Sequence, residues 1–339
     1  MSVAEELHPA SNARVRFPTR RLGHANIFVA DADKTADFYI NVAGIEECAR
    51  EPHIPAIFIT NGNTHHDYGL VQCGGGKELR GRDGHVQRVA GRGREPGLNH
   101  LGWEMESERL LVAAHDRAVA MGLPIHRRTD HTISHSIYVF DPDGHLHEMY
   151  ADVLENWRTV LNGSLPSITG EWKVDAKTAS STPLWGAEPY VRQVPKAPFH
   201  PIRVTRAVFV SNRLDAMRQY YTNVLGLEDG YDAPDGSFFS LRGHASAYDV
   251  AFFRAAPGQK PGMVHTSLLM PSERSIDEGK RALKSMGMSD LIVFEVDNAA
   301  KKSLFLRDPD GLGVEFFVER AGGFAGIGDH DLATRPYYA

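Results

Sequence analysis

Cysteine is scarce in this sequence, which has only Cys48 and Cys73 among its 339 residues. Two cysteines exclude a framework of several disulfides, so the reducing cytoplasm is the expected compartment. Long apolar runs are missing too, and residues 1–20 lack the continuous apolar core of a secretory signal, so we expect no membrane span and no signal peptide. Positive charge is not in excess either: the net charge is −6, and nucleic-acid binding is therefore not expected.

The composition that remains is typical of a globular protein, with 42% hydrophobic and 24% charged residues. A chain of this length has room for about two domains of ordinary size. Histidine is the unusual residue, because the chain has 17 and many of them lie in its first half. Imidazole both ligates metals and titrates near neutral pH, so this count indicates metal or acid–base chemistry without deciding between them.

An internal repeat predicts how the chain is divided. The sequence F-Y-I-N-V-A-G-I-E-E at residues 38–47 recurs as Y-Y-T-N-V-L-G-L-E-D at residues 220–229, and D-P-D-G at residues 141–144 recurs at residues 308–311. We therefore predict two similar domains. The first covers residues 18–160, a connecting segment covers 161–200, the second domain covers 201–320, and a C-terminal tail covers 321–339.

The first domain has mixed secondary-structure signals. Strands are predicted near residues 21–30, 56–60, 66–72 and 98–105, and helices near 34–42 and 108–121, the first of them capped by Asp31 or Asp33. A strand at residues 132–140, a type I turn at D-P-D-G and a returning strand at 145–150 follow. Residues 73–96, rich in Gly and Arg, are predicted to form a long surface loop. The pattern favours an α+β fold built from β-α-β-β-β units.

The stretch from Thr129 to Glu148 has the pattern T-x-H-x5-I-Y-x2-D-P-x-G-x3-E. This pattern resembles the signature of the type I extradiol ring-cleavage dioxygenases of the vicinal-oxygen-chelate superfamily. The resemblance implies that each domain pairs two β-α-β-β-β units into a cupped mixed sheet. It also implies that Glu148 is an iron ligand and that His131 and Tyr138 lie over a bound catechol. An ordinary hairpin with a common turn is the alternative interpretation.

Two more histidines match the family's metal ligands. His24 and His100 each lie in the first predicted strand of a unit, and with Glu148 they complete the set of two histidines and one carboxylate that suits non-haem Fe(II). Mn(II) suits the same set. The motif H-H-D-Y-G-L-V resembles the family's motif in which the histidine before Asp lies beside the oxygen site, so His66 is the candidate acid–base residue. A further set of histidines is interpreted as structural or surface residues: His53, His65, His85, His126, His135, His145 and His147.

The second domain provides an internal comparison. Repeat alignment places Arg206 at the position of His24, Tyr248 at that of His66, Asn298 at that of His131 and Phe305 at that of Tyr138. An arginine cannot ligate a metal cation. We therefore expect the first domain to be catalytic and the second to be structural, although the C-terminal half is catalytic in the commoner two-domain members of the family.

A different pairing of units is the alternative assembly. It would join His24 to His265 and Glu315 across the two domains.

The charges at Arg127 and Arg128, just before His131, are interpreted as solvated loop residues. Their alternative role is to hold a carboxylate on the substrate.

The resemblance implies an Fe(II)-dependent extradiol dioxygenase that opens a catechol-type ring with O2 and assembles as a homo-oligomer. Another metal enzyme on the same scaffold is one rival, such as a glyoxalase, an epimerase or a 4-hydroxyphenylpyruvate dioxygenase. A ligand-binding protein without catalysis is a second rival. The other metal enzymes have no need for His66, His131 and Tyr138 together, and in the binding protein the cavity would hold a ligand and no redox metal.

The proposed site makes a demand on the geometry of the hairpin. Side chains alternate between faces along a strand, so Tyr138 and Glu148 share a face only when they lie opposite each other. A two-residue loop at Pro142 and Asp143 would put them on opposite faces. We therefore predict a loop of odd length or a bulge between Phe140 and Leu146, with Gly144 supplying a positive φ.

Overall fold

The computed structural model describes residues 14–51, 54–81, 84–155, 157, 163–164, 170–185, 193–324 and 326–339. His53, most of the N-terminal leader and the predicted boundary at residues 160–161 lie outside the described residues. Within the described residues, no helix has both the length and the apolar character needed to cross a membrane.

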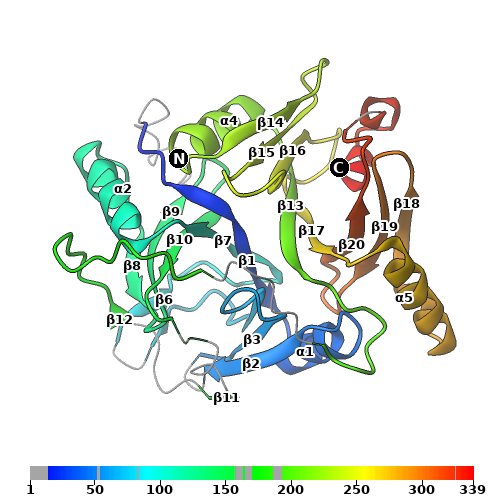
Figure 1. The fold of residues 1–339 in the computed structure, drawn as a ribbon, viewed down its shortest axis with the longest axis horizontal. Coiled ribbons are helices and arrows are strands. Elements are labelled where there is room, and N and C mark those ends of the chain that lie inside the picture. The colour runs from blue at the N-terminus through cyan, green and yellow to red at the C-terminus, as the bar shows by residue number, and fades with distance from the viewer. Residues whose placement is uncertain are drawn as a thin grey trace.

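The chain forms two twisted mixed sheets that lie side by side, with β1 and β13 adjacent at the centre (Figure 1). The first sheet has the strand order β11-β2-β3-β4-β1-β7-β10-β9-β8-β12. Its strands are β1 (Thr19–Val29), β2 (Glu46–Glu51), β3 (Ala56–Thr60), β4 (Tyr68–Gln72), β7 (Gly97–Met105), β8 (Arg127–Asp130), β9 (Ser134–Phe140), β10 (Leu146–Asp152), β11 (Gly163–Ser164) and β12 (Gly170–Glu171). The helices of this half are α1 (Ala32–Asn41) and α2 (Glu108–Ala120).

The second sheet repeats the arrangement in the order β14-β15-β16-β13-β17-β20-β19-β18. Its strands are β13 (Arg203–Ser211), β14 (Glu228–Asp232), β15 (Phe238–Arg242), β16 (Val250–Arg254), β17 (Gly262–Leu269), β18 (Ile292–Asp297), β19 (Lys301–Arg307) and β20 (Gly313–Glu319). Its helices are α4 (Leu214–Asn223) and α5 (Glu273–Ser285), and the 3-10 helices are η1 (Ser289–Leu291), η2 (Ile327–Asp329) and η3 (Arg335–Tyr338). The expected α+β fold of two cupped sheets is confirmed.

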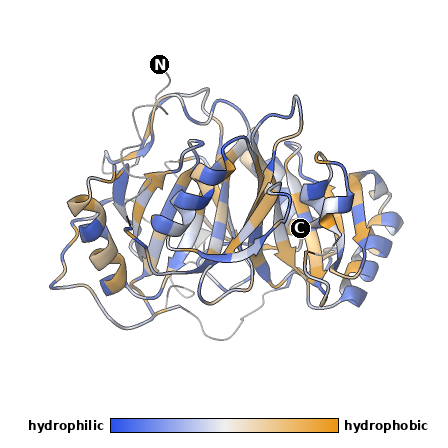
Figure 2. Ribbon diagram, turned by 90° about the horizontal axis from the view of Figure 1, so that it is seen from above, coloured by the Kyte–Doolittle hydropathy of each residue, from blue (hydrophilic) through white to orange (hydrophobic). Residues whose placement is uncertain are grey.

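Strand β1 shows how the sequence builds the first cup. Ala25, Ile27 and Val29 lie in the hydrophobic core, so His24 and Asn26 on the other face point into the cup. A register shift between residues 22 and 24 reverses the alternation, because Leu22 is also a core residue although it is two positions before His24. Figure 2 shows hydrophobic residues concentrated in the strands of the two sheets.

The predicted hairpin geometry is confirmed. Tyr138 lies directly opposite Glu148, and Phe140 lies opposite Leu146, which leaves a connection of odd length between β9 and β10. The Gly144 N–H donates to the Asp141 carbonyl over 3.0 Å, and Gly144 has a φ of 84°. The turn therefore places Tyr138 and Glu148 on one face of the sheet.

Some elements were missed from the sequence or predicted with the wrong bounds. β2 and β8 were not located from the sequence, because each is a short strand with charged residues. Residues 73–96 are not a loop without secondary structure, since β5 (Leu79–Arg80) pairs with β6 (Val86–Arg88). The first helix begins two residues earlier than predicted, and the expected cap Asp31 accepts from the Lys34 N–H.

The connecting segment and the tail both pack onto the sheets. β11 pairs with β2 and β12 pairs with β8, so the connecting segment extends both edges of the first sheet, and Trp172 stacks on His135. The tail closes the second cup, where Phe324 stacks on Tyr231 and Tyr337 contacts Phe305.

The two domains exchange matching contacts. The Phe17 N–H donates to the Val224 carbonyl, and the Phe199 N–H donates to the Val42 carbonyl. A second matching pair follows the repeat. The hydroxyl of Tyr221 in α4 lies 3.3 Å from the Asp141 carboxylate, and the hydroxyl of Tyr39 in α1 lies 3.5 Å from the Asp308 carboxylate. The duplicated sequences of the repeat thus contribute matching contacts between the two halves.

Candidate metal centre

Three adjacent strands bring His24, His100 and Glu148 together. The carboxylate of Glu148 in β10 lies 3.0 Å from Nε2 of His24 in β1 and 2.8 Å from Nε2 of His100 in β7. One potential ligand atom from each residue lies within 4.8 Å of the others, and all three side chains are buried. Gly102 is the strand neighbour of both His24 and Glu148, and a Cβ there would lie 2.0 Å from His24 Nε2. Glycine at this position therefore leaves room for the imidazole.

The charges around Glu148 fit a metal ion. Burial would raise the pKa of this carboxyl group, but hydrogen bonds with His100, His131 and His24 outweigh burial and hold the pKa well below its usual range. The ion pairs of Glu148 within the described residues are with histidines, which carry no permanent charge. A buried carboxylate without a permanent cation is costly, and a divalent metal between two imidazoles and a carboxylate removes that cost.

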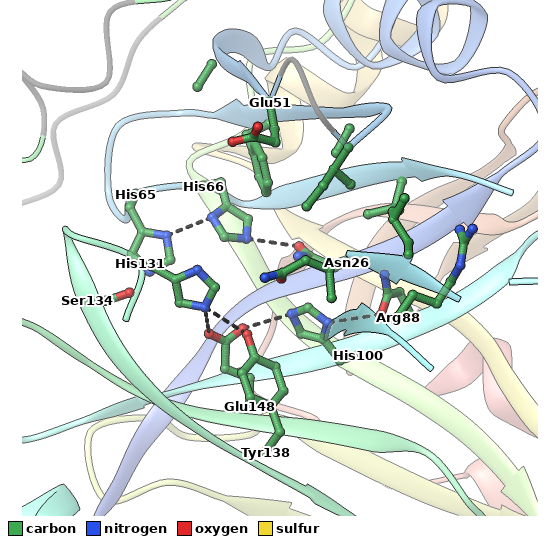
Figure 3. Close-up of a pocket in the computed structure, with 18 of the residues that line it drawn as sticks. Asn26, Glu51, His65, His66, Arg88, His100, His131, Ser134, Tyr138 and Glu148 are labelled. Carbon is green, nitrogen blue, oxygen red and sulfur yellow. Dashed lines mark hydrogen bonds and ion pairs between the residues drawn. The ribbon is translucent and has the colours of Figure 1, made fainter. Parts of the chain in front are cut away.

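The hairpin residues lie beside this cluster (Figure 3). Nε2 of His131 is 3.0 Å from the Tyr138 hydroxyl and 3.3 Å from the Glu148 carboxylate. His131 lies between β8 and β9, while Tyr138 lies within β9. Burial, reinforced by Glu148, raises the pKa of Tyr138 well above its ordinary value, so its hydroxyl stays protonated and can donate a hydrogen bond.

His66 reaches the same cavity from the turn between β3 and β4. Its Nε2 lies 2.9 Å from the amide oxygen of Asn26, and its Nδ1 lies 2.7 Å from Nδ1 of His65 (Figure 3). Burial and the nearby His24 lower the pKa of His66 well below its usual value. The prediction that His65 lies on an exposed edge strand was wrong, because His65 is 3% exposed and lines the cavity.

The sequence reasoning also missed Asn26. This residue lies two positions after His24 on the same strand and faces the same cavity. That spacing was the available signal, because side chains two apart in a strand share a face.

Arg127 was misread as a solvated loop charge. It lies in β8, and its guanidinium stacks 3.9 Å from the centre of the Tyr138 ring. It also donates to the carbonyls of Val86 and Gln87, so it ties β6 to the cavity wall. Arg128 points elsewhere, because its Nε lies 2.7 Å from Nε2 of His115.

The far wall of the cavity is apolar. It faces the metal cluster and is formed by Ile54, Ala56, Phe58, Val71 and Leu79. Leu79, Gln87 and Arg88 come from the 73–96 segment, so the segment predicted as a surface loop is partly a cavity wall.

The alternative assembly was wrong. His24 pairs with Glu148 of its own domain, and His265 lies 3.6 Å from Glu315 in the second domain. No described contact joins His24 to either second-domain residue. β1, β7 and β10 are neighbours in one sheet, and β17 and β20 are neighbours in the other.

Comparison with known proteins identifies the family. The family model for the Glyoxalase/Bleomycin resistance protein/Dioxygenase superfamily matches residues 21–149 and 203–316. The chain therefore belongs to this superfamily, and the resemblance drawn from its motifs is confirmed at that level.

Two curated relatives are dioxygenases. The chain is 29% identical over 124 residues to biphenyl-2,3-diol 1,2-dioxygenase 3 of Rhodococcus globerulus, which covers 34% of this chain and 63% of the relative. It is 32% identical over 128 residues to 2,2',3-trihydroxybiphenyl dioxygenase of Sphingomonas paucimobilis, which covers 36% of this chain and 41% of the relative. The matched region spans less than two thirds of either relative.

Solved structures share the fold. A substrate complex of homoprotocatechuate 2,3-dioxygenase from Brevibacterium fuscum matches with a TM-score of 0.61 at 14% identity, over 92% of this chain and 83% of that one. The Mn(II)-bound glyoxalase from Novosphingobium aromaticivorans matches with a TM-score of 0.59 at 16% identity, over 89% and 84% of the two chains. At these identities the likeness defines the fold alone, and the same fold carries both activities.

Proposed function

We propose that this protein is a metal-dependent extradiol dioxygenase that cleaves a catechol-type aromatic ring with O2. The observation that carries the proposal is Glu148, a buried carboxylate surrounded by imidazoles at the wall of a cavity that also contains His66 and Tyr138. The names of both curated relatives, which are dioxygenases of aromatic diols, support the reaction class.

The first domain would hold Fe(II) through His24, His100 and Glu148, and Mn(II) fits the same donors. When bound, the metal supplies the redox chemistry between an aromatic diol and O2. Tyr138, with its hydroxyl protonated, would donate a hydrogen bond to a substrate oxygen. His131 would fix the direction of that hydroxyl through the 3.0 Å contact between them.

His66 would move protons in this reaction. It faces the metal cluster from the opposite side to Tyr138, with its ring 4.1 Å from the ring of His24. An imidazole in this place can accept a proton from a substrate hydroxyl and return it to the opened product. Asn26 and His65 would orient its ring, because they contact its two nitrogens.

Metal content and oxygen uptake together test this function. We expect protein reconstituted anaerobically with Fe(II) to hold one metal per chain and to consume O2 when 2,3-dihydroxybiphenyl or catechol is added. Glu148→Gln should lose at least about tenfold in metal affinity, because a neutral amide is a poor ligand and leaves the two histidines unsupported.

The controls separate the rival functions. Glu315→Gln, the matching change in the second domain, should keep the metal, provided that circular dichroism shows it folded. A glyoxalase or epimerase would bind metal and show no oxygen uptake with catechols. A ligand-binding protein would bind the diol without metal. Either result would overturn the proposed reaction.

A further inference from the structure

The second domain contains a close counterpart of the metal cluster. Arg206 is paired with Ser267 and Ser267 with Glu315, as His24 is paired with Gly102 and Gly102 with Glu148. Phe305 lies opposite Glu315, as Tyr138 lies opposite Glu148. Strand register therefore establishes that the two glutamates occupy equivalent positions.

The cation beside Glu315 is a lysine. The Lys301 ammonium lies 2.5 Å from the Glu315 carboxylate, and the two side chains are 2% and 0% exposed. Lys301 begins β19 at the position where Ser134 begins β9. Burial would raise the pKa of Glu315, but the ammonium of Lys301 outweighs burial and the pKa ends below its usual range. The chain thus supplies Glu315 with a permanently charged partner, whereas the described partners of Glu148 are histidines.

Two further replacements close the second site to a metal. The hydroxyl of Ser267, at the position of Gly102, donates to Glu315 over 2.6 Å. Arg206, at the position of His24, has its guanidinium between the rings of Tyr248 and Phe317 and pairs with Glu319. Of the three ligands, the second domain retains the histidine and the carboxylate, His265 and Glu315.

The C-terminal tail packs against His265 and Lys301. Tyr337 stacks on His265 with an interplanar angle of 14°, and the Lys301 ammonium donates to the Ala339 carbonyl. The Lys301 ammonium therefore contacts two kinds of oxygen, the Glu315 carboxylate and the Ala339 carbonyl. Oxygen atoms of these two kinds are ligands that a divalent cation would also take.

We infer that the second domain holds a latent divalent-metal site in which the Lys301 ammonium occupies the place of the cation. The inference rests on the proposed metal centre of the first domain, which defines the equivalent positions. Arg206→His, Ser267→Gly and Lys301→Ser together restore every ligand and remove the internal cation. The second cup then has the same buried residues as the first at all four positions: two histidines, a carboxylate and the glycine that leaves them room.

Metal stoichiometry tests the inference. Wild-type protein is stripped with a chelator and reloaded with Mn(II), and its metal content is measured by elemental mass spectrometry. It should hold one metal per chain. The triple variant should hold two. Adding Glu148→Gln or Glu315→Gln to the triple variant should return the number to one in each case, because each change removes one of the two sites.

The reverse change provides an independent test. Ser134→Lys places an ammonium beside Glu148 and should reduce the metal content of a folded protein from one to zero. A folded triple variant that still holds one metal overturns the inference, and so does a Ser134→Lys protein that keeps its metal. If the triple variant does not fold, Ser134→Lys alone decides. Wild-type protein that holds no metal overturns the proposed function instead.

Discussion

Glu148 and Glu315 are the same residue at equivalent positions, and their neighbours give them different roles. Three imidazoles surround Glu148, and a lysine ammonium lies beside Glu315. A buried carboxylate needs a positive partner, so the identity of that partner determines whether the site can accept a metal. Among the described residues of the first domain, the ion-pair partners of Glu148 are histidines, so none of them carries a permanent charge.

His66→Phe is expected to separate metal binding from proton transfer. The phenyl ring keeps the shape of the side chain but cannot exchange a proton, so kcat should fall by about 10²-fold or more while metal content stays at the wild-type value. Steady-state oxygen uptake and elemental analysis check the two quantities. His244→Phe is the matched control, because His244 is an exposed histidine paired with Glu106 far from the cavity. A kcat unchanged in the His66 variant would remove this residue from the mechanism.

At the residue scale the sequence predicted the cluster better than its surroundings. Six predicted residues line or adjoin one cavity: His24, His100, Glu148, His66, His131 and Tyr138. Four of them were predicted from motifs, and His24 and His100 from their place in the first strand of a unit. His65, Asn26 and Arg127 were missed or misread. Their positions depend on how a turn and an edge strand fold over the sheet, and local sequence does not determine such contacts.

The two D-P-D-G turns are elements of identical sequence in different electrostatic surroundings. In the first, His145 and His147 outweigh burial, and the pKa of Asp141 is held below its usual range. In the second, burial dominates and raises the pKa of Asp308 to about 6. The turn residues were predictable from the sequence, but the opposite pKa shifts were not, because the groups that cause them differ outside the motif.

Asp308→Asn is expected to change how stability depends on pH. A carboxyl group whose pKa is raised in the folded state contributes stability that is present at acidic pH and is lost as the pH rises through about 6. The amide keeps the oxygen that accepts from the N–H groups of Asp310 and Leu312 and cannot ionise. The variant should therefore gain roughly 1–3 kcal/mol relative to wild type between pH 4 and pH 7.

Urea unfolding at a series of pH values measures this gain. Asp141→Asn is the matched control and should change in the opposite direction, since ionised Asp141 is stabilised by His145 and His147. A stability difference between Asp308→Asn and wild type that stays constant from pH 4 to pH 7 would contradict the prediction.

At the scale of the whole molecule, the repeat marks the contacts between the domains. Gly44 and Gly226 are the last residues of the duplicated N-V-x-G sequence, and both have a positive φ. A methyl group on Gly44 would lie 1.8 Å from the Phe199 carbonyl oxygen, and one on Gly226 would lie 2.0 Å from the Phe17 carbonyl oxygen. These glycines let the chain that precedes each sheet lie directly against the other domain.

Gly44→Ala and Gly226→Ala should each lower the free energy of unfolding by about 2–4 kcal/mol, through backbone strain and a clash with a main-chain carbonyl. Gly258→Ala is the control, because Gly258 has a φ of 79° and no atom within 4 Å of an added Cβ. Gly258→Ala introduces the backbone strain without the clash, so it should lower the free energy of unfolding by only about 1 kcal/mol. Chemical denaturation measures all three. Equal losses of stability in the three variants would show that the close contact between the domains adds nothing to the effect of the backbone strain.

The tyrosine–aspartate contacts between the domains join residues that are synthesised far apart in time. Asp141 leaves the ribosome 80 residues before its partner Tyr221, and Tyr39 leaves 269 residues before Asp308. In a nascent chain, Tyr39 and the turn at Asp141 therefore stay without these partners until the second domain has been translated. Surfaces that are transiently exposed in this way during folding bind chaperones and associate with other nascent chains. A ribosome that stalls between the domains would release a half that lacks the partners of Tyr39 and Asp141.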